Sequence, residues 1–331
     1  MMAKIFARKF NKSSYFCLES WRKPCRVSDV KILTLESSTP IQAMMLISFC
    51  SDKPPYDVTL ALTLLLSIGC GLGENVFMSQ HIILESIANF RQLGGLIAAN
   101  GRKIRANCLF RCSALDRLNE PDTQQLAQLA GVTILDYRDI HEAQAKPDRI
   151  VAGGDYLNVP ANPPDLAVDV KVVEFLPQAI EALDVDRFMT QLYQQLPFNN
   201  PAWHQLIATL SHPETNTVIQ HCAVGKDRTG IGCAITLLVL GCEESVIIDD
   251  YLATNGRLES IGQQALAQWP VAVSEKAQAN FRQLLSVDKA WLVAAFTEIK
   301  QRYVSIDQWL EQEYGVTAQQ RQTIQDKWLE A

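Results

Sequence analysis

From residue 85 to the end of the chain, apolar positions fall into short runs and longer helical stretches. The short runs Gly131–Leu135 and Asn216–Gln220 are rich in β-branched residues, which is typical of buried strands. The stretch Thr229–Leu240 is apolar on nearly every side and stops at Gly241, which predicts a buried helix. Further elements are predicted as helices at 121–129, 185–195 and 201–211, and as a long loop over the Gly-, Pro- and Asp-rich residues 151–180.

The segment between the second strand and the buried helix reads HCAVGKDRTG, at residues 221–230. Cys222 therefore opens a tight loop that leads into the N-terminus of a buried helix. Backbone N–H groups at a helix start have no partner within the helix, and the helix dipole adds about half a positive charge there. An anion such as phosphate fits this place. A cysteine beside these donors and beside Arg228 is expected to be a thiolate, which is the nucleophilic form.

Five residues separate Cys222 from Arg228, which is enough chain to wrap one phosphate group. The N–H groups of such a loop converge on the phosphate oxygens. Arg228 is expected to bind two of these oxygens in a two-pronged contact, and the Thr229 hydroxyl is expected to hydrogen-bond the Cys222 sulfur. The predicted substrate-binding residues of the loop are Ala223, Val224, Gly225, Lys226 and Thr229.

Three other interpretations of the loop are weaker. A buried and inert free cysteine is common in proteins, but it leaves the rest of the motif unexplained. A nucleotide-binding P-loop requires a glycine where Gln220 stands and a hydroxyl residue where Asp227 stands. A sulfur-transfer enzyme also uses a cysteine loop, but Arg228 followed by Thr229 favours phosphate.

The form HCxxGKDRTG resembles the signature loop of cysteine-dependent phosphatases, in particular of bacterial tyrosine phosphatases whose loop sequence overlaps with that of lipid phosphatases. Two segments ahead of the loop resemble other motifs of that family. NFRQLGG at residues 89–95 is similar to its NFRDLGG segment, with Gln92 in place of aspartate. FRCSAL at residues 110–115 is similar to its FRSxxL segment, with Cys112 in place of serine.

Three further segments extend the resemblance over about residues 85–331. Residues 136–138, DYR, follow a predicted strand and resemble a DLR motif. Residues 244–255, ESVIIDDYLATN, resemble a helix with the motif DYLxxN. Residues 295–317 resemble a closing pair of helices in which Val304 replaces a glycine, so the turn there is expected to differ.

The resemblance implies an α/β cysteine-dependent phosphatase fold, with a small mainly parallel sheet flanked by helices and extra helices near the active site. It implies hydrolysis of phosphomonoesters through a phosphocysteine on Cys222, without a metal or another cofactor. Phosphotyrosine in proteins is the first expected substrate, and phosphoserine, phosphothreonine and phosphoinositides are further candidates. Lys226, expected at the rim of the loop, would suit a doubly phosphorylated lipid headgroup. A phosphate-binding module without turnover and a thiol redox enzyme are the alternative functions.

The departing oxygen needs a proton, and the chain lacks the WPD sequence that supplies it in other members of the wider superfamily. Asp227 in the loop and Asp136 at a strand end are the two candidates. Asp227 is preferred because it cannot be far from bound phosphate. Asp136 and Arg138 are expected to contact substrate, or else to pair with each other. Glu142 and Asp148 are expected to face solvent.

Composition narrows the function further. A net charge of −6 over 331 residues argues against general nucleic-acid binding. The nine cysteines are odd in number and include no CxxC pair, which indicates a reducing compartment and not a disulfide scaffold. The five histidines show no metal-ligand spacing. The sequence therefore predicts a cytoplasmic protein without a metal, and nothing in it supports a membrane contact beyond the N-terminal segment.

Residues 1–77 are expected to be an extension that is poorly structured or not part of the domain, which leaves 78–331 as the phosphatase domain. The chain through Lys31 contains eight basic and two acidic residues, a net charge of +6. Residues 58–73 are 16 residues without charge. A spanning helix needs about 20 residues, so this run is short for one. A secreted or membrane-associated protein is the alternative if the run is a real targeting sequence.

Overall fold

The structure is a computed structural model that describes residues 82–150, 153–163, 177–269 and 273–331, together with the backbone of four strands near the N-terminus. The chain divides into two compact units, Met1–Val76 and Phe77–Ala331. Among the described helices, none is both long and apolar enough to cross a membrane.

The first unit contains a four-stranded sheet in the order β1-β2-β4-β3. Its strands are β1 (Lys4–Phe10), β2 (Ser13–Glu19), β3 (Asp29–Thr34) and β4 (Met44–Phe49). β1 pairs with β2, and β3 with β4, in the antiparallel sense, whereas β2 and β4 are parallel. The uncharged run 58–73 lies outside the described residues. That residues 1–77 are separate from the phosphatase domain stays a prediction.

The second unit is built on a five-stranded sheet in the order β5-β6-β9-β7-β8. Its strands are β5 (Arg91–Gln92), β6 (Leu109–Cys112), β7 (Val132–Asp136), β8 (Asp155–Asn158) and β9 (Thr217–His221). β5 runs antiparallel to β6, and the other neighbouring pairs are parallel. The four parallel strands end in register at one edge of the sheet, where their last residues are Cys112, Asp136, Asn158 and His221.

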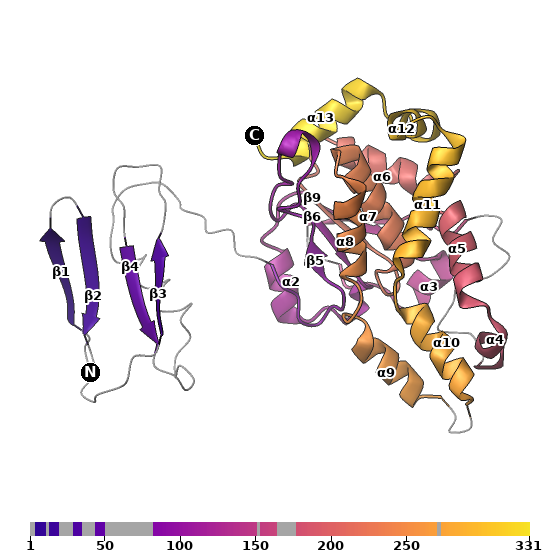
Figure 1. Ribbon diagram of the computed structural model, residues 1–331, viewed down its shortest axis with the longest axis horizontal. Coiled ribbons are helices and arrows are strands. Elements are labelled where there is room, and N and C mark those ends of the chain that lie inside the picture. The colour runs from indigo at the N-terminus through magenta and orange to yellow at the C-terminus, as the bar shows by residue number, and fades with distance from the viewer. Residues whose placement is uncertain are drawn as a thin grey trace. The chain divides into compact units, whose positions relative to one another are not determined.

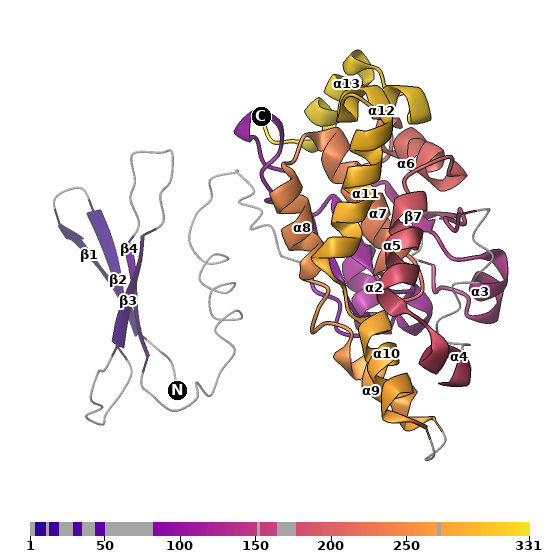
Figure 2. The same ribbon diagram turned by 45° about the vertical axis from the view of Figure 1, so that its right-hand side comes forward.

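The described residues of this unit also form twelve α-helices. They are α2 (Glu120–Leu126), α3 (Ile140–Ala145), α4 (Pro177–Ala182), α5 (Val185–Gln195), α6 (Pro201–Ser211), α7 (Asp227–Leu240), α8 (Glu244–Leu252), α9 (Glu259–Ala267), α10 (Glu275–Leu285), α11 (Lys289–Arg302), α12 (Ile306–Tyr314) and α13 (Ala318–Trp328). α7 packs against β9 and is surrounded by α6, α8 and α13 (Figure 1). Figure 2 shows α4, α9 and α10 together at one end of the unit.

Alternation along the strands creates two cores, one on each face of the sheet. Leu109, Leu135 and Val218 point into the larger core, which also contains the apolar side chains of α5 to α8 and α10 to α13. Their neighbours on the other face belong to a smaller core beneath α2. α7 is buried along its whole length from Arg228 to Leu240, because it lies between the sheet and the outer helices. It ends at Gly241, which adopts φ +82°.

The sequence predicted this α/β architecture correctly, including both buried strands and the buried helix, which begins two residues earlier than expected. The long loop predicted over 151–180 is wrong in part, because Asp155–Asn158 form the edge strand β8 and α4 begins at Pro177. Residues 151–152 and 164–176 of that prediction lie outside the described residues. β8 is half-exposed and too short for a clear pattern, since only Tyr156 and Leu157 of its four residues are apolar, and each packs against one of the two cores. Val304 is 93% exposed in the turn after α11, and that turn does not use a positive φ, so no glycine is required.

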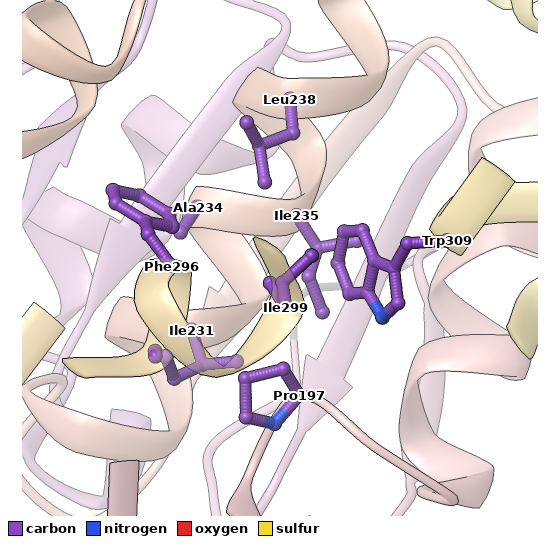
Figure 3. A pocket seen from close by; sticks show the side chains of 9 residues that line it. Pro197, Ile231, Ala234, Ile235, Leu238, Phe296, Ile299 and Trp309 are labelled. Carbon is purple, nitrogen blue, oxygen red and sulfur yellow. The ribbon is translucent and has the colours of Figure 1, made fainter. Parts of the chain in front are cut away.

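A small apolar pocket lies between α7, α11 and α12 (Figure 3). Aliphatic and aromatic side chains line it: Pro197, Ile231, Ala234, Ile235, Leu238, Ala295, Phe296, Ile299 and Trp309. A phosphate group requires charged or polar donors, and this lining offers hardly any. The pocket therefore belongs to the core, and the site for a phosphate must be sought at the carboxyl edge of the sheet.

Candidate active site

The loop from Cys222 to Arg228 joins the carboxyl end of β9 to the first turn of α7. Cys222 directly follows the central strand and is 2% exposed. The predicted loop residues Ala223, Val224 and Gly225 lie between it and the helix. Ligands of open α/β sheets gather at this edge, and the start of α7 directs its unpaired N–H groups here.

Three successive backbone carbonyls of this loop accept hydrogen bonds from residues outside the loop. Ala223 O accepts from the backbone N–H of Ala114 (3.2 Å), and Gly225 O accepts from Asn89 Nδ2 (2.8 Å). Asn89 Nδ2 also donates to Val224 O (3.3 Å). In a trans peptide the N–H points opposite to the C=O. The N–H groups of Val224, Gly225 and Lys226 are therefore turned away from these anchors, as a phosphate-binding loop requires.

The Gly225 carbonyl accepts a second hydrogen bond, from Arg111 Nη2 (2.9 Å). Asp250 on α8 fixes Arg111 (2.6 Å) and also Arg91 (2.9 Å). Burial alone would raise the pKa of Asp250, but the two arginines lower it below its ordinary value, so the carboxylate stays charged. Asn89 and these three residues belong to the segments NFRQLGG, FRCSAL and DDYLATN. The sequence motifs could have located them, but their task, which is to orient the loop, appears only in the structure.

Gly225 is required by its surroundings. It adopts φ +70°, and a Cβ built on it would lie 2.1 Å from the Cys112 carbonyl oxygen. The three nearest atoms, which are O and C of Cys112 and N of Ser113, all belong to the backbone at the end of β6, so a side-chain movement cannot relieve the contact. The loop can therefore pass over the end of β6 only with glycine at this position.

We expect Gly225→Ala to lower kcat/KM for an aryl phosphate by about 100-fold, the size of effect that a displacement of about 1 Å at an active site can cause. The matched control is Gly256→Ala. Gly256 also has a positive φ, of +81°, but nothing lies within 4 Å of its added Cβ. Steady-state kinetics and thermal melts of both variants test the point. Equal activities for the two alanine variants would contradict the loop geometry.

Arg228 has five N–H donors, and the structure shows which of them remain for phosphate. Nη1 donates to Glu142 Oε2 (2.5 Å) and to the Tyr137 carbonyl (3.4 Å), and Nη2 donates to Glu142 Oε1 (3.1 Å). Within the described part of the chain, Nε–H and the second N–H of Nη2 have no acceptor, and these two lie on one edge of the guanidinium. That edge matches two oxygens of a phosphate group.

Glu142 on α3 is the residue that fixes Arg228. The prediction that Glu142 faces solvent is wrong, since its side chain is 17% exposed and binds the guanidinium with both oxygens. Burial alone would lower the pKa of Arg228, but Glu142 and the nearby Cys222 raise it above its ordinary value. Arg228 is therefore a permanent cation beside the cysteine.

Asp136 and Arg138 pair with each other, which is the alternative that the sequence left open. Arg138 Nη2 donates to Asp136 Oδ2 (2.7 Å), and the Tyr156 hydroxyl donates to the same oxygen (2.7 Å). Both residues are buried. Burial alone would raise the pKa of Asp136, but His221 and Arg138 lower it below its ordinary value. Neither side chain is exposed for contact with a substrate.

Asp148 joins this cluster, so the prediction that it faces solvent is also wrong. Its side chain is 1% exposed, accepts from Arg138 Nη2 (2.7 Å), and lies 3.2 Å from His221 Nε2. It also accepts from the backbone N–H of Leu115 (2.7 Å). Asp148 therefore connects Leu115, which follows β6, and Arg138, which follows β7, to His221, the residue that precedes Cys222.

Asp136, Asp148 and His221 bring three potential metal-ligand atoms within 4.8 Å of one another. Arg138 donates to both carboxylates and already supplies the positive charge that two buried acids require. These residues therefore fit an ion-pair cluster that supports the loop better than they fit a metal site. That the reaction needs no metal stays a prediction.

The Thr229 hydroxyl is buried and finds no hydrogen-bond partner among the residues that the structure describes. The expected hydrogen bond to the Cys222 sulfur is therefore not formed in this state. A buried hydroxyl without a partner is costly, and this one sits in the first turn of α7. It is available to a group that enters the loop.

Lys226 is not at an exposed rim, which corrects the expectation from the sequence. It is 2% exposed, donates to Asp227 Oδ1 (2.6 Å), and lies 5.4 Å from the centre of the Trp291 ring. Asp227 is the first residue of α7 and its side chain is 13% exposed. Tyr193 on α5 donates to the same Asp227 oxygen (2.8 Å). Helices α5 and α11 thus border the loop.

A strand-loop-helix unit with a cysteine and an arginine at the start of a helix is the kind of site that binds a phosphate group. A family model described as the tyrosine phosphatase family matches residues 82–330. The chain belongs to this family, and it is a protein-tyrosine phosphatase, a phosphoric monoester hydrolase whose substrates are phosphorylated.

Curated relatives agree with this assignment. A Cupriavidus necator protein that is named as a tyrosine-protein phosphatase is 28% identical to this chain over 230 residues. The match covers 69% of this chain and 82% of that protein. The triple specificity protein phosphatase PtpB of Mycobacterium tuberculosis is 27% identical over 258 residues, covering 69% of this chain and 87% of that protein. A tyrosine-protein phosphatase of Nostoc commune is 25% identical over 170 residues, covering 49% of this chain and 53% of that protein.

Proposed function

We propose that this phosphatase hydrolyses phosphomonoesters through a phosphocysteine on Cys222. The Cys222 sulfur attacks phosphorus, an S–P bond forms, and the P–O bond to the leaving group breaks. The observation that carries the proposal concerns Arg228 in the first turn of α7, close to Cys222. Among the described residues, two N–H donors on one edge of its guanidinium have no acceptor, because Glu142 occupies the other edge. These donors and the loop N–H groups would bind the equatorial oxygens, where charge spreads in the transition state.

The leaving oxygen takes its proton from Asp227 in this proposal. Asp227 lies in the loop next to Arg228, and its side chain is partly exposed. Asp136 suits the role poorly, because it is buried and its lowered pKa keeps it ionised. A general acid must hold a proton at the start of the step and must reach the departing oxygen.

The second step returns the enzyme to its starting state. Water attacks phosphorus of the phosphocysteine, the S–P bond breaks, and inorganic phosphate leaves with the Cys222 thiolate restored. The Asp227 carboxylate left by the first step takes the proton of the water, which restores the acid. One group thus serves both steps, and atoms and charge balance without a metal or another cofactor.

Phosphotyrosine in proteins is the substrate that we propose first, with phosphoserine, phosphothreonine and phosphoinositides as further candidates. The mycobacterial relative, named a triple specificity phosphatase, supports a range wider than tyrosine for this chain. The phosphoinositide candidate no longer has the support of Lys226, because its ammonium group is buried against Asp227 and Trp291.

The thiol redox alternative finds little support in the other cysteines. Burial raises the pKa of the Cys108 thiol to about 12, and raises that of Cys112 well above its ordinary value. A resolving cysteine must ionise to attack a disulfide. Both thiols therefore fit the core better than a redox pair with Cys222.

A substrate panel with EDTA present tests the proposal. Purified full-length protein should hydrolyse phosphotyrosine peptides and aryl phosphates without an added metal. Phosphoserine and phosphothreonine peptides and short-chain phosphoinositides in the same assay measure the substrate range. A strict requirement for a divalent metal, or binding of phosphate without any turnover, would overturn the proposed function.

A further inference from the structure

Two buried tyrosines form a chain of hydroxyl groups that ends on Asp227. The Tyr251 hydroxyl on α8 donates to the Tyr193 hydroxyl on α5 (2.7 Å), which donates to Asp227 Oδ1 (2.8 Å). Both tyrosines are at most 1% exposed. A phenylalanine would fill nearly the same volume in either place. The hydroxyls are therefore not needed to fill the core, and their chain leads to the proposed general acid.

Both donors to the Asp227 carboxylate use the same oxygen. Lys226 Nζ donates to Oδ1 (2.6 Å), as does the Tyr193 hydroxyl, and no described residue donates to Oδ2. Oδ1 can accept these two hydrogen bonds whether the carboxyl group is charged or neutral. A proton on the neutral carboxyl group must therefore sit on Oδ2, because Oδ1 already faces two donors.

We infer that Tyr193 is a positioning residue for catalysis: its hydroxyl fixes the rotation of the Asp227 carboxyl group, so that Oδ2 carries the proton and faces the leaving oxygen. Tyr251 acts one step further back, by fixing the hydroxyl of Tyr193. This inference rests on the proposed role of Asp227 as the general acid. Tyr193 itself acts only through Asp227 and touches no substrate atom.

Tyr193 remains a donor over the working pH range. Burial, and then the charge of Asp227, raise the pKa of Tyr193 well above its ordinary value, and the same two causes raise that of Tyr251. The other ionisable groups that act on this chain of hydroxyls are Lys226 at the start of α7, Arg111 on β6 and Asp288 before α11. None of these groups replaces the hydrogen bond that Tyr193 donates.

Tyr193→Phe in the full-length protein tests the inference with two substrates, phenyl phosphate and dinitrophenyl phosphate. We expect kcat for phenyl phosphate to fall about 10-fold, the size of one hydrogen bond to a charged group. The first-step rate with dinitrophenyl phosphate, measured as the burst of dinitrophenol, should change by less than about 2-fold, because a good leaving group departs without a proton. KM should be unchanged for both substrates, since Tyr193 does not contact phosphate.

The pH–rate profile gives a readout that a merely structural role would not move. Loss of the hydroxyl removes a donor from the charged carboxylate, so the carboxyl group keeps its proton to higher pH. The basic limb of kcat for phenyl phosphate should therefore shift to higher pH in Tyr193→Phe. Tyr251→Phe should show both changes in the same direction with smaller size.

Tyr314→Phe is the matched control, because it also removes a buried tyrosine hydroxyl, one that donates to the Pro197 carbonyl. Its ratio of rates on the two substrates and its basic limb should equal those of the unchanged protein. If Tyr193→Phe slows both substrates equally, or leaves the basic limb in place, while Asp227→Asn shows leaving-group dependence, Tyr193 is structural and the acid assignment stands. If Asp227→Asn lacks that dependence, both assignments fall together.

Discussion

Cys222→Ser should abolish hydrolysis of aryl phosphates while the protein still binds phosphate or vanadate. We expect kcat to fall by about 10⁴-fold or more, as when the nucleophile of a covalent mechanism is removed. The serine hydroxyl is a far weaker nucleophile than a thiolate at neutral pH. Binding should persist because Arg228 and the inward N–H groups of the loop are unchanged, and steady-state rates with vanadate titration measure both effects.

Cys242→Ser is the matched control for this variant. Cys242 is a buried free cysteine that follows α7 at its far end from the loop. Its replacement should leave kcat close to that of the unchanged protein, with at most a modest loss of thermal stability. Substantial activity in Cys222→Ser would rule out a phosphocysteine on that residue.

Asp227→Asn should slow phenyl phosphate by about 10²- to 10⁴-fold, the usual contribution of a general acid. Dinitrophenyl phosphate should be affected only slightly in its first step, because its leaving group needs no proton. The basic limb of the pH–rate profile should disappear, since the group that loses its proton there has been removed. A burst assay separates the first step from hydrolysis of the intermediate.

A purely structural role of Asp227 predicts a different pattern of rates. If Asp227→Asn slows both substrates equally and keeps the basic limb, Asp227 shapes the loop through its ion pair with Lys226. The proton donor would then be another residue, and Asp136→Asn would be the next variant to measure. The buried state of Asp136 and its hydrogen bonds to Arg138 and Tyr156 argue against that outcome.

The fold around the loop could be predicted because its signals are local. The β-branched strand, the glycine in the loop and the helix that is apolar on every side lie within 25 consecutive residues, Asn216–Leu240. Strand, turn and helix propensities therefore agree over the segment. The motif NFRQLGG was equally visible, but the role of Asn89 was not, since the Gly225 carbonyl that it holds lies 136 positions away.

The errors concern polar residues whose partners are distant in sequence. Glu142 and Asp148 stand in polar, charged stretches, which usually face solvent. No local pattern shows that Glu142 binds Arg228, which lies 86 positions further along the chain. Lys226 appeared to be at a rim because the sequence does not show that Trp291 covers it. Tyr193 was placed correctly on a helix at 185–195, but the partner of its hydroxyl follows only from tertiary packing.

Direct trapping of the intermediate tests whether Cys222 forms a phosphocysteine. The protein is mixed with dinitrophenyl phosphate, quenched in acid within the first turnovers, and digested for mass spectrometry. We expect a single added phosphoryl group on the peptide that contains Cys222, attached to sulfur and absent from Cys222→Ser. Rapid release of dinitrophenol without any phosphorylated peptide, or a phosphoryl group attached to His221 instead, would contradict it.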